Sequence, residues 1–378
     1  MASVKDTVTS VFIKNFIIPK AQVLDQPGFI IFKMGGKSKV YSRQIIFPES
    51  FLVDLETQLV EKYGDSGREA LYLAGKKFGY LFASMGNFFS AKNFQDNKKL
   101  VEYVGLLNNF IEGTYAKKMT FEADLNIPKV DFFLDNFISC NKSGLGYFLP
   151  TGAAAGLLCY LLERDDIEGV QTDCQGNGSS VCKVVYSIPS YFSEKNIKFI
   201  QKNPFEKVLV GAEYANWNKT QPTKYSQDSF QKLLNSKFFS YSQGIIEKDS
   251  KRYFIFEASG PYIIENELSG IKGFTEILLN ASVKEGENLF FIGAKNIKGL
   301  SDLLTAFGWG DVFILKKADK YLVNIDYYPW TLLYERSDFI IIQGILQGAL
   351  SKIDNRPVSF SSKKKNFNSG GLSVSFFE

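Results

Sequence analysis

The chain has 378 residues, 45% of them hydrophobic and 15% aromatic, with a net charge of +4 and no histidine. This length favours two domains, and the small, scattered excess of basic residues does not favour a nucleic-acid-binding protein. The lack of histidine excludes Ser–His–Asp and Cys–His catalysis and histidine-ligated metal or haem sites within the chain. Because Met1–Ile18 lacks the pattern of a secretory signal and four cysteines do not suggest a disulfide scaffold, we expect a cytoplasmic protein.

The N-terminal part of the chain predicts strands followed by amphipathic helices. Three apolar runs predict strands: Ser10–Ile18, Gly28–Met34 and Val40–Phe47. Three segments with apolar residues repeating at helical spacing predict helices: Glu49–Lys62, Gly67–Met85 and Asn97–Ile111. Ser66 and Glu69 form a capping-box pattern at the start of the second helix. A β-hairpin is predicted next, from Thr114–Asp124 and Lys129–Asn136.

A glycine-rich apolar segment, Gly144–Leu162, is the centre of the most specific pattern in the sequence. Gly152 and Gly156 are four residues apart and share one helix face, which lets another backbone approach closely. Pro150 and four glycines favour a buried helix over a membrane span. A hairpin pattern follows, with Cys174 and Cys182 on either side of its turn.

The same order of patterns recurs in the C-terminal part, after a polar and irregular stretch. Two strands, Phe238–Ile246 and Tyr253–Glu257, precede two helices, Gly270–Asn280 and Ile297–Ala306, and the hairpin Asp311–Lys316 with Tyr321–Tyr328. The segment Asp338–Leu350 carries Gly344 and Gly348, again four apart, and precedes a last hairpin. In this alignment Cys182 falls at Ser373, so the second copy has no cysteine.

The repeated order predicts an α/β (α+β) fold of two tandem modules, each an antiparallel sheet packed against helices. We expect a first module at 1–190, a linker or peripheral segment at 191–236, and a diverged second module at 237–378. Duplicated modules often pack about a two-fold axis, so we also expect dimer-like packing of the two.

The hairpin cysteines leave three interpretations open. Cys174 and Cys182 are reduced structural residues, a disulfide, or two ligands of a soft metal such as zinc. A zinc site needs two further ligands, for which Cys140 and Cys159 are candidates, together with Asp173 and Glu163.

The first module resembles the 4-vinyl-reductase domain, named for proteins associated with bacteriochlorophyll synthesis. The resemblance covers Arg43–Phe82, the helix with Gly152 and Gly156, and the cysteine hairpin. In the second module it rests on Phe307–Val312 and the segment with Gly344 and Gly348. The family fold is similar to subunits of the TRAPP vesicle-tethering complex, and relatives include sensor domains of phenol- and xylene-responsive transcription activators. The resemblance implies a module that binds small molecules.

The resemblance also implies a metal site. In zinc-bearing relatives the two hairpin cysteines are ligands, which by match are Cys174 and Cys182. A glutamate ligand three residues before the first of them falls on Gln171, and a further cysteine falls near Phe148, so both positions depart from the pattern. Cys140 and Cys159 are the candidates to replace that cysteine, and zinc is the cofactor we expect.

Together these patterns favour a non-catalytic protein that binds or senses an apolar or aromatic small molecule, a tetrapyrrole or a lipid. The ligand pocket is expected between the sheet and the Gly144–Leu162 helix, with a volume of about 300–1,000 Å³. Six aromatic residues are expected to line it: Phe110, Tyr115, Phe132, Phe133, Tyr147 and Phe148. The alternatives are that these aromatics only fill the core, that the chain is an assembly scaffold with a protein partner or a second copy, or that it serves tetrapyrrole reduction.

Overall fold

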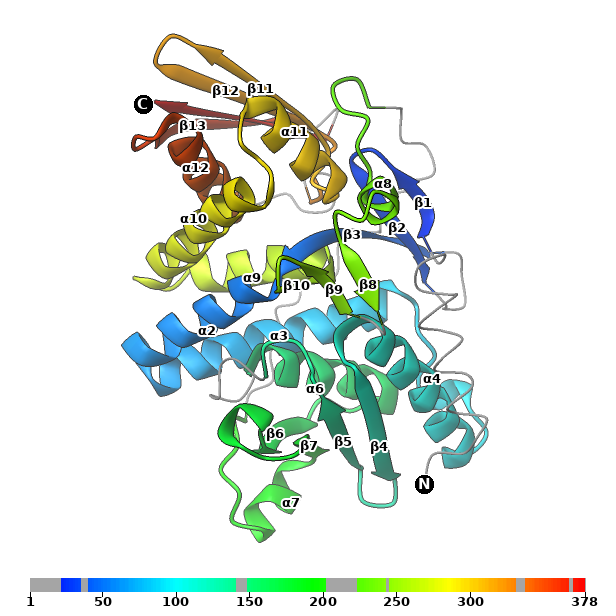
Figure 1. The fold of residues 1–378 in the computed structure, drawn as a ribbon. Coiled ribbons are helices and arrows are strands. Elements are labelled where there is room, and N and C mark those ends of the chain that lie inside the picture. Colours follow the sequence, from blue (N-terminus) through cyan, green and yellow to red (C-terminus); the bar gives the residue numbers. More distant parts are fainter. Residues whose placement is uncertain are drawn as a thin grey trace.

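The computed structural model describes residues 22–34, 40–140, 148–201, 223–242, 245–330, 337–366 and 370–377. Three antiparallel sheets pack against helices, which confirms the predicted α+β fold class (Figure 1). The described residues up to 201 form the first half of the chain, and those from 223 onward form the second half.

The first half begins with three strands and continues with helices and two hairpins. Its strands are β1 (Gln22–Gln26), β2 (Phe29–Met34), β3 (Val40–Pro48), β4 (Lys118–Asp124), β5 (Lys129–Asp135), β6 (Glu168–Asp173) and β7 (Cys182–Ser187). Its helices are α2 (Glu49–Tyr63), α3 (Asp65–Met85), η2 (Ala91–Asn93), α4 (Asn97–Tyr115), α6 (Phe148–Leu162), η3 (Gln175–Asn177) and α7 (Pro189–Glu194).

The second half has a similar but not identical order of elements. Its strands are β8 (Ser240–Ser242), β9 (Ile245–Lys248), β10 (Lys251–Glu257), β11 (Asp311–Lys317), β12 (Lys320–Asp326), β13 (Ser359–Asn366) and β14 (Gly371–Phe377). Its helices are α8 (Phe230–Asn235), α9 (Ser259–Ser269), α10 (Phe274–Ile292), α11 (Ile297–Ala306) and α12 (Ile340–Asp354).

Each half carries a four-stranded sheet of the same topology. The strand orders are β4-β5-β7-β6 and β11-β12-β14-β13. Leu134 of β5 pairs with Cys182, and Ile325 of β12 pairs with Leu372. Leu372 is buried like Cys182, whereas Ser373 is exposed. The predicted alignment of Cys182 with Ser373 was therefore one residue out of register, which would turn the side chain to the opposite face of the sheet.

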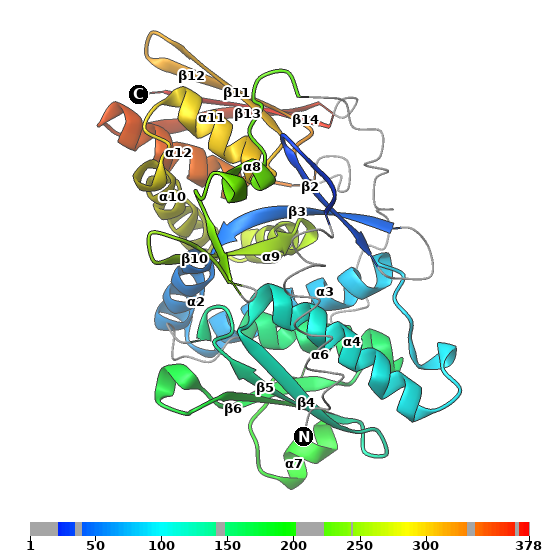
Figure 2. The same ribbon diagram turned by 45° about the vertical axis from the view of Figure 1, so that its right-hand side comes forward.

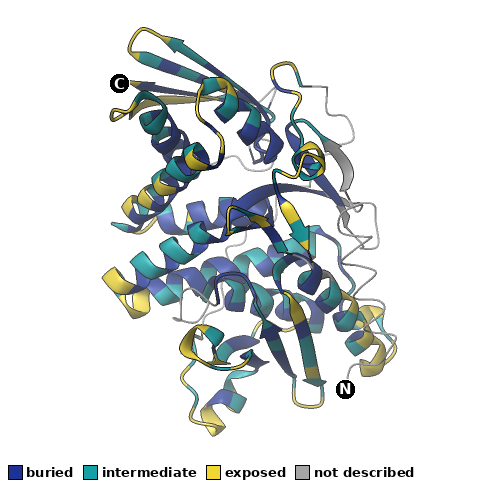
Figure 3. Ribbon diagram, in the orientation of Figure 1, coloured by how far each residue is buried: buried dark blue, intermediate teal, exposed yellow. Residues whose placement is uncertain are grey.

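The third sheet joins the two halves. Its order is β1-β2-β3-β10-β9-β8, with β3 from the first half antiparallel to β10 from the second (Figure 2). Ile46 pairs with Ile255 near the middle of this contact. Because the halves share a sheet, the predicted domain limits of 1–190, 191–236 and 237–378 stay a prediction. Figure 3 shows buried residues along this central sheet and on the helix faces turned toward it.

Local chemistry explains where the first helices begin and end. Pro48 precedes α2, and Gly64 follows it with φ +54°, a conformation that glycine adopts without steric cost. The predicted capping box at Ser66 was wrong, because α3 already begins at Asp65 with Gly64 as its N-cap and no side-chain capping bond. Among the described helices, none combines the length and hydropathy that a bilayer crossing requires.

Some helices and strands differ from the predicted ones in position or length. The helix α9 lies where no helix was predicted, and α10 extends from Phe274 to Ile292 rather than from Gly270 to Asn280. Pro261, near the start of α9, sits in the first turn, where its missing N–H costs no hydrogen bond. The predicted strand Ser10–Ile18 lies outside the described residues.

Candidate functional site

A cavity of about 150 Å³ is lined mainly by residues of the first half. Helices α3, α4 and α6 and strands β5 and β7 supply most of its wall. This volume is at most half of the predicted volume of about 300–1,000 Å³. It matches the volume of cavities that hold a single benzene-sized molecule. Residues that line the cavity include Phe78, Asn108, Tyr115, Met119, Phe132, Phe137, Leu149, Leu157, Leu161, Tyr186, Phe254 and Phe256.

Glycines of α3 and α6 allow these two helices, which line the cavity, to pack closely against each other. A Cβ atom on Gly152 would lie 2.0 Å from the Tyr72 carbonyl oxygen, and one on Gly156 would lie 1.9 Å from the Lys76 carbonyl oxygen. On α3, a Cβ on Gly79 would lie 1.8 Å from the Ala153 carbonyl oxygen. The two backbones therefore touch on this face, and leucines elsewhere on α6 reach the cavity.

Asn108 brings a polar group to this apolar wall. Its side chain is 5% exposed, and its Nδ2 donates to the Met119 carbonyl oxygen at 3.0 Å. Its Oδ1 is buried and has no hydrogen-bond partner among the described residues. A buried acceptor without a partner costs free energy, which a hydrogen bond donated to this oxygen would recover.

Two tyrosines of the cavity wall keep their hydroxyl protons at neutral pH. Burial is the main cause that raises the pKa of Tyr115 far above its usual value, and the negative charge of Glu257 adds to it. Burial also raises the pKa of Tyr186. These side chains are therefore neutral and suit a neutral ligand.

The structure sorts the six aromatic residues predicted for the pocket. Tyr115 and Phe132 line the cavity. Phe133 and Phe148 do not: the Phe133 ring lies beneath the Lys183 ammonium, and the Phe148 ring beneath the Arg68 guanidinium. Tyr147 and the side chain of Phe110 lie outside the described residues.

Sequence reasoning missed Asn108 and the phenylalanines of β10. Asn108 lies four residues after Val104 on the apolar stripe of α4, and a lone amide on such a stripe is a usable signal. Phe254 and Phe256 come from the second half, and no local pattern could have assigned them to a cavity in the first.

Three of the four cysteines form a second candidate site. The sulfur atoms of Cys140, Cys174 and Cys182 all lie within 4.8 Å of one another, and all three residues are buried. The Cys140 and Cys174 sulfurs are 3.5 Å apart, and the Gln175 backbone N–H donates to the Cys182 sulfur at 3.1 Å. Gln171, at the position where relatives are expected to place glutamate, has its Nε2 3.8 Å from the Cys140 sulfur.

A disulfide joins Cys140 and Cys182, whose Cα atoms are 7.7 Å apart. This Cα separation exceeds the range that disulfides tolerate without backbone movement, whereas three converging sulfurs suit a tetrahedral metal. Cys159 stands apart from the cluster and donates to the Ile167 carbonyl oxygen at 3.5 Å. Burial raises the pKa of its thiol to about 12, so it stays protonated.

Comparison with known proteins finds structural similarity alone. No family model and no curated protein matches the chain. Eleven chains of solved structures match, among them the phenol-responsive sensory domain of the transcription activator PoxR with phenol. That match has 17% sequence identity and a TM-score of 0.32, and it covers 41% of this chain and 82% of the other. The resemblance to the 4-vinyl-reductase domain therefore stays a prediction.

Proposed function

We propose that the chain is a non-catalytic protein that binds one small apolar or aromatic molecule in the cavity of the first half. The observation that carries this proposal is a cavity of about 150 Å³ with an almost wholly apolar wall. Removing an apolar surface from water is favourable by roughly 25 cal/mol per Å² before the costs of association, so a fitting molecule would bind.

The size of the cavity narrows the ligand class proposed from the sequence. A tetrapyrrole contains four linked five-membered rings and needs several times the space of one benzene ring. A cavity of about 150 Å³ accommodates a single ring with small substituents. The unpartnered Oδ1 of Asn108 further favours a ring that carries one hydroxyl or amine hydrogen.

Calorimetric titration with phenol and toluene tests this proposal. The two molecules have similar shapes, but only phenol can donate to Asn108. We expect phenol to bind more tightly than toluene by roughly threefold to tenfold, the contribution of one hydrogen bond between neutral groups. In Asn108→Leu this preference should disappear while toluene still binds.

Ser301→Ala is the matched control for Asn108→Leu. Ser301 makes the corresponding hydrogen bond in the second half, from its hydroxyl to the Val312 carbonyl oxygen. Its loss should lower thermal stability without changing the ratio of phenol to toluene affinity. Absence of saturable binding of either molecule to the unaltered protein would contradict the proposed function.

We also propose that, when the Cys140–Cys182 disulfide is reduced, Cys140, Cys174 and Cys182 hold a zinc ion as thiolates. The convergence of three buried sulfurs supports this assignment, and the side-chain amide of Gln171 is the nearest candidate for a further ligand. Cys140 follows β5 while the other two flank the η3 turn, so the ion would tie that turn to the neighbouring strand. Such a site would contribute to folding rather than to chemistry.

A further inference from the structure

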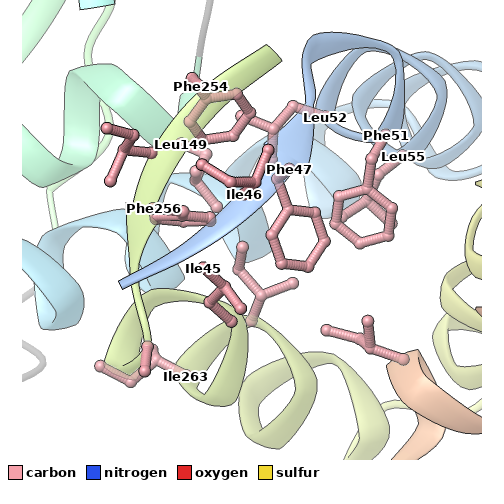
Figure 4. Close-up of a cluster of buried hydrophobic side chains, with 14 of the residues drawn as sticks. Ile45, Ile46, Phe47, Phe51, Leu52, Leu55, Leu149, Phe254, Phe256 and Ile263 are labelled. Carbon is pink, nitrogen blue, oxygen red and sulfur yellow. The ribbon is translucent and has the colours of Figure 1, made fainter. Parts of the chain in front are cut away.

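One wall of the cavity comes from the other half of the chain. Phe254 and Phe256 of β10 line it, each with 4% or less of its surface exposed. Figure 4 shows the Phe254 ring between Leu52 and Leu149, and both leucines line the same cavity, from α2 and α6. The Phe256 ring meets Phe78 edge to face, with centroids 5.5 Å apart.

Arg252, also on β10, fixes this wall to the first half. Its guanidinium donates to the Asn136 carbonyl oxygen at 2.7 Å and to the Tyr115 carbonyl oxygen at 2.8 Å. Tyr115 itself lines the cavity. Strand β10 is therefore held in place by charge-assisted hydrogen bonds next to the residues that it helps to enclose.

The corresponding part of the second half can be located from matching hydrogen bonds. Asn108 bonds to Met119 across eleven residues, as Ser301 bonds to Val312. The Met119 N–H donates to Glu112 across seven residues, and the Val312 N–H donates to Thr305 across the same spacing. Helix α4 and strand β4 therefore correspond to α11 and β11.

By this correspondence, tryptophans stand in the second half where the first half has small residues. Ala116 and Trp309 each lie two residues before the strand, and Ser139 and Trp330 each lie four residues after the next one. Both tryptophans are at most 2% exposed, with ring centroids 5.9 Å apart. Both also pack on Tyr328, which corresponds to Phe137 in the cavity wall.

We infer that the second half is a filled, non-binding copy whose β10 strand sets the size of the ligand accepted by the first half. This inference rests on the proposed function. It assigns size selectivity to Phe254 and Phe256 and one ligand to each chain. Tyr253, which alternates with Phe254 along β10, packs against Phe239 and Phe307 of the second half, so the phenylalanines of β10 form a firm wall rather than a movable one.

The test is a titration of Phe256→Leu with toluene and naphthalene, which differ by one fused ring. In the unaltered protein, toluene should bind and naphthalene should be rejected. The smaller side chain should shift the affinity ratio toward naphthalene by roughly tenfold or more, since pockets discriminate by this factor for small changes in apolar volume. Native mass spectrometry should show one toluene per chain.

Two further variants keep the outcome decisive. Phe274→Leu removes the same atoms from a buried residue that packs on Tyr63 of α2 and does not line the cavity, so it should leave the ratio unchanged. Gly260→Ala would place a Cβ atom 2.2 Å from the Phe256 ring. We expect it to push the ring into the cavity and weaken toluene binding, which tests the same wall if Phe256→Leu does not fold.

The possible failures can be told apart. If the unaltered protein binds neither toluene nor phenol, the proposed function itself fails. If it binds toluene but Phe256→Leu folds with an unchanged ratio, or if Gly260→Ala leaves toluene affinity unchanged, the inference about β10 is overturned. Two toluene molecules per chain would show that the tryptophans do not close the second half.

Discussion

Glu56 and Glu265 are buried carboxyl groups at equivalent places in the two halves. Glu56 of α2 accepts from the Leu149 N–H at the start of α6, at 3.1 Å. Glu265 of α9 accepts from the Phe339 and Ile341 N–H groups at the start of α12. Each side chain caps the glycine-containing helix of its half from a neighbouring helix, because the first N–H groups of a helix have no partner within it.

The pKa of Glu56 predicts how stability depends on pH. Burial raises this pKa from 4.5 to about 8, so between these values the folded protein keeps a proton that the unfolded chain has lost. Its contribution to stability is therefore full below pH 4.5 and is lost as the pH rises to about 8. We expect Glu56→Gln to reduce the loss of unfolding free energy between pH 5 and pH 8, measured by urea denaturation.

Glu285 gives a comparison for this measurement. Burial raises its pKa to about 8 as well, so part of the pH dependence should remain in Glu56→Gln. An unchanged slope in Glu56→Gln would show that Glu56 is ionised or rearranged in the folded protein.

At the scale of elements, the crossing of α3 and α6 depends on glycine. A Cβ atom on Gly156 would lie 1.9 Å from the Lys76 carbonyl oxygen, which is backbone and cannot move aside alone. We expect Gly156→Ala to destabilise the protein by about 3 kcal/mol or more, measured by chemical denaturation. Gly270→Ala is the control, since nothing lies within 4 Å of its added Cβ, and it should change stability by no more than about 0.5 kcal/mol.

The cysteine cluster gives a second prediction for single elements. We expect zinc to copurify with the protein, and Cys140→Ser, Cys174→Ser and Cys182→Ser each to lower both metal content and the temperature of unfolding. Cys159→Ser should retain the metal, because Cys159 lies outside the cluster. Full metal content in the Cys174→Ser, Cys182→Ser double variant would rule out this site.

The sequence could predict those elements whose signals are local. Helix α11 lies where the apolar repeat predicted it, at Ile297–Ala306, and the cysteine hairpin forms around the predicted turn. Cys140 could not be assigned to the cluster from spacing, because the fold brings it across from the end of β5. The contribution of β10 to the cavity wall could not be predicted for the same reason, because the sequence of neither strand shows that β3 pairs with β10.

At the scale of the whole molecule, two arginines connect the halves in opposite directions. Arg252 of the second half donates to Asn136 and Tyr115 of the first. Arg43 of the first half donates to the carbonyl oxygens of Tyr327 and Gly308 in the second, at 2.7 and 2.9 Å. Asn136 and Tyr327 each directly follow the end of a strand and have positive φ. Dimer-like packing of the two halves about a two-fold axis stays a prediction.

Because each half contributes one such arginine, effects on stability and on ligand binding can be tested separately. Arg252→Met and Arg43→Met should each destabilise the protein by roughly 2–5 kcal/mol, because each leaves buried carbonyl groups unpaired. Only Arg252→Met should also weaken toluene binding, since only Arg252 holds residues of the cavity wall. Denaturation and calorimetry on both variants check this, and equal losses of affinity would contradict it.

The pairing of β3 with β10 has a consequence for how the two halves can differ. In a dimer of identical subunits, every substitution appears twice, so a tryptophan that closes one site closes both. Here the partner surfaces are parts of one chain, so a tryptophan can stand at position 309 of one half while the corresponding position of the other half carries Ala116. Joining both sides covalently also makes their association intramolecular, so the assembly does not come apart on dilution as a dimer would.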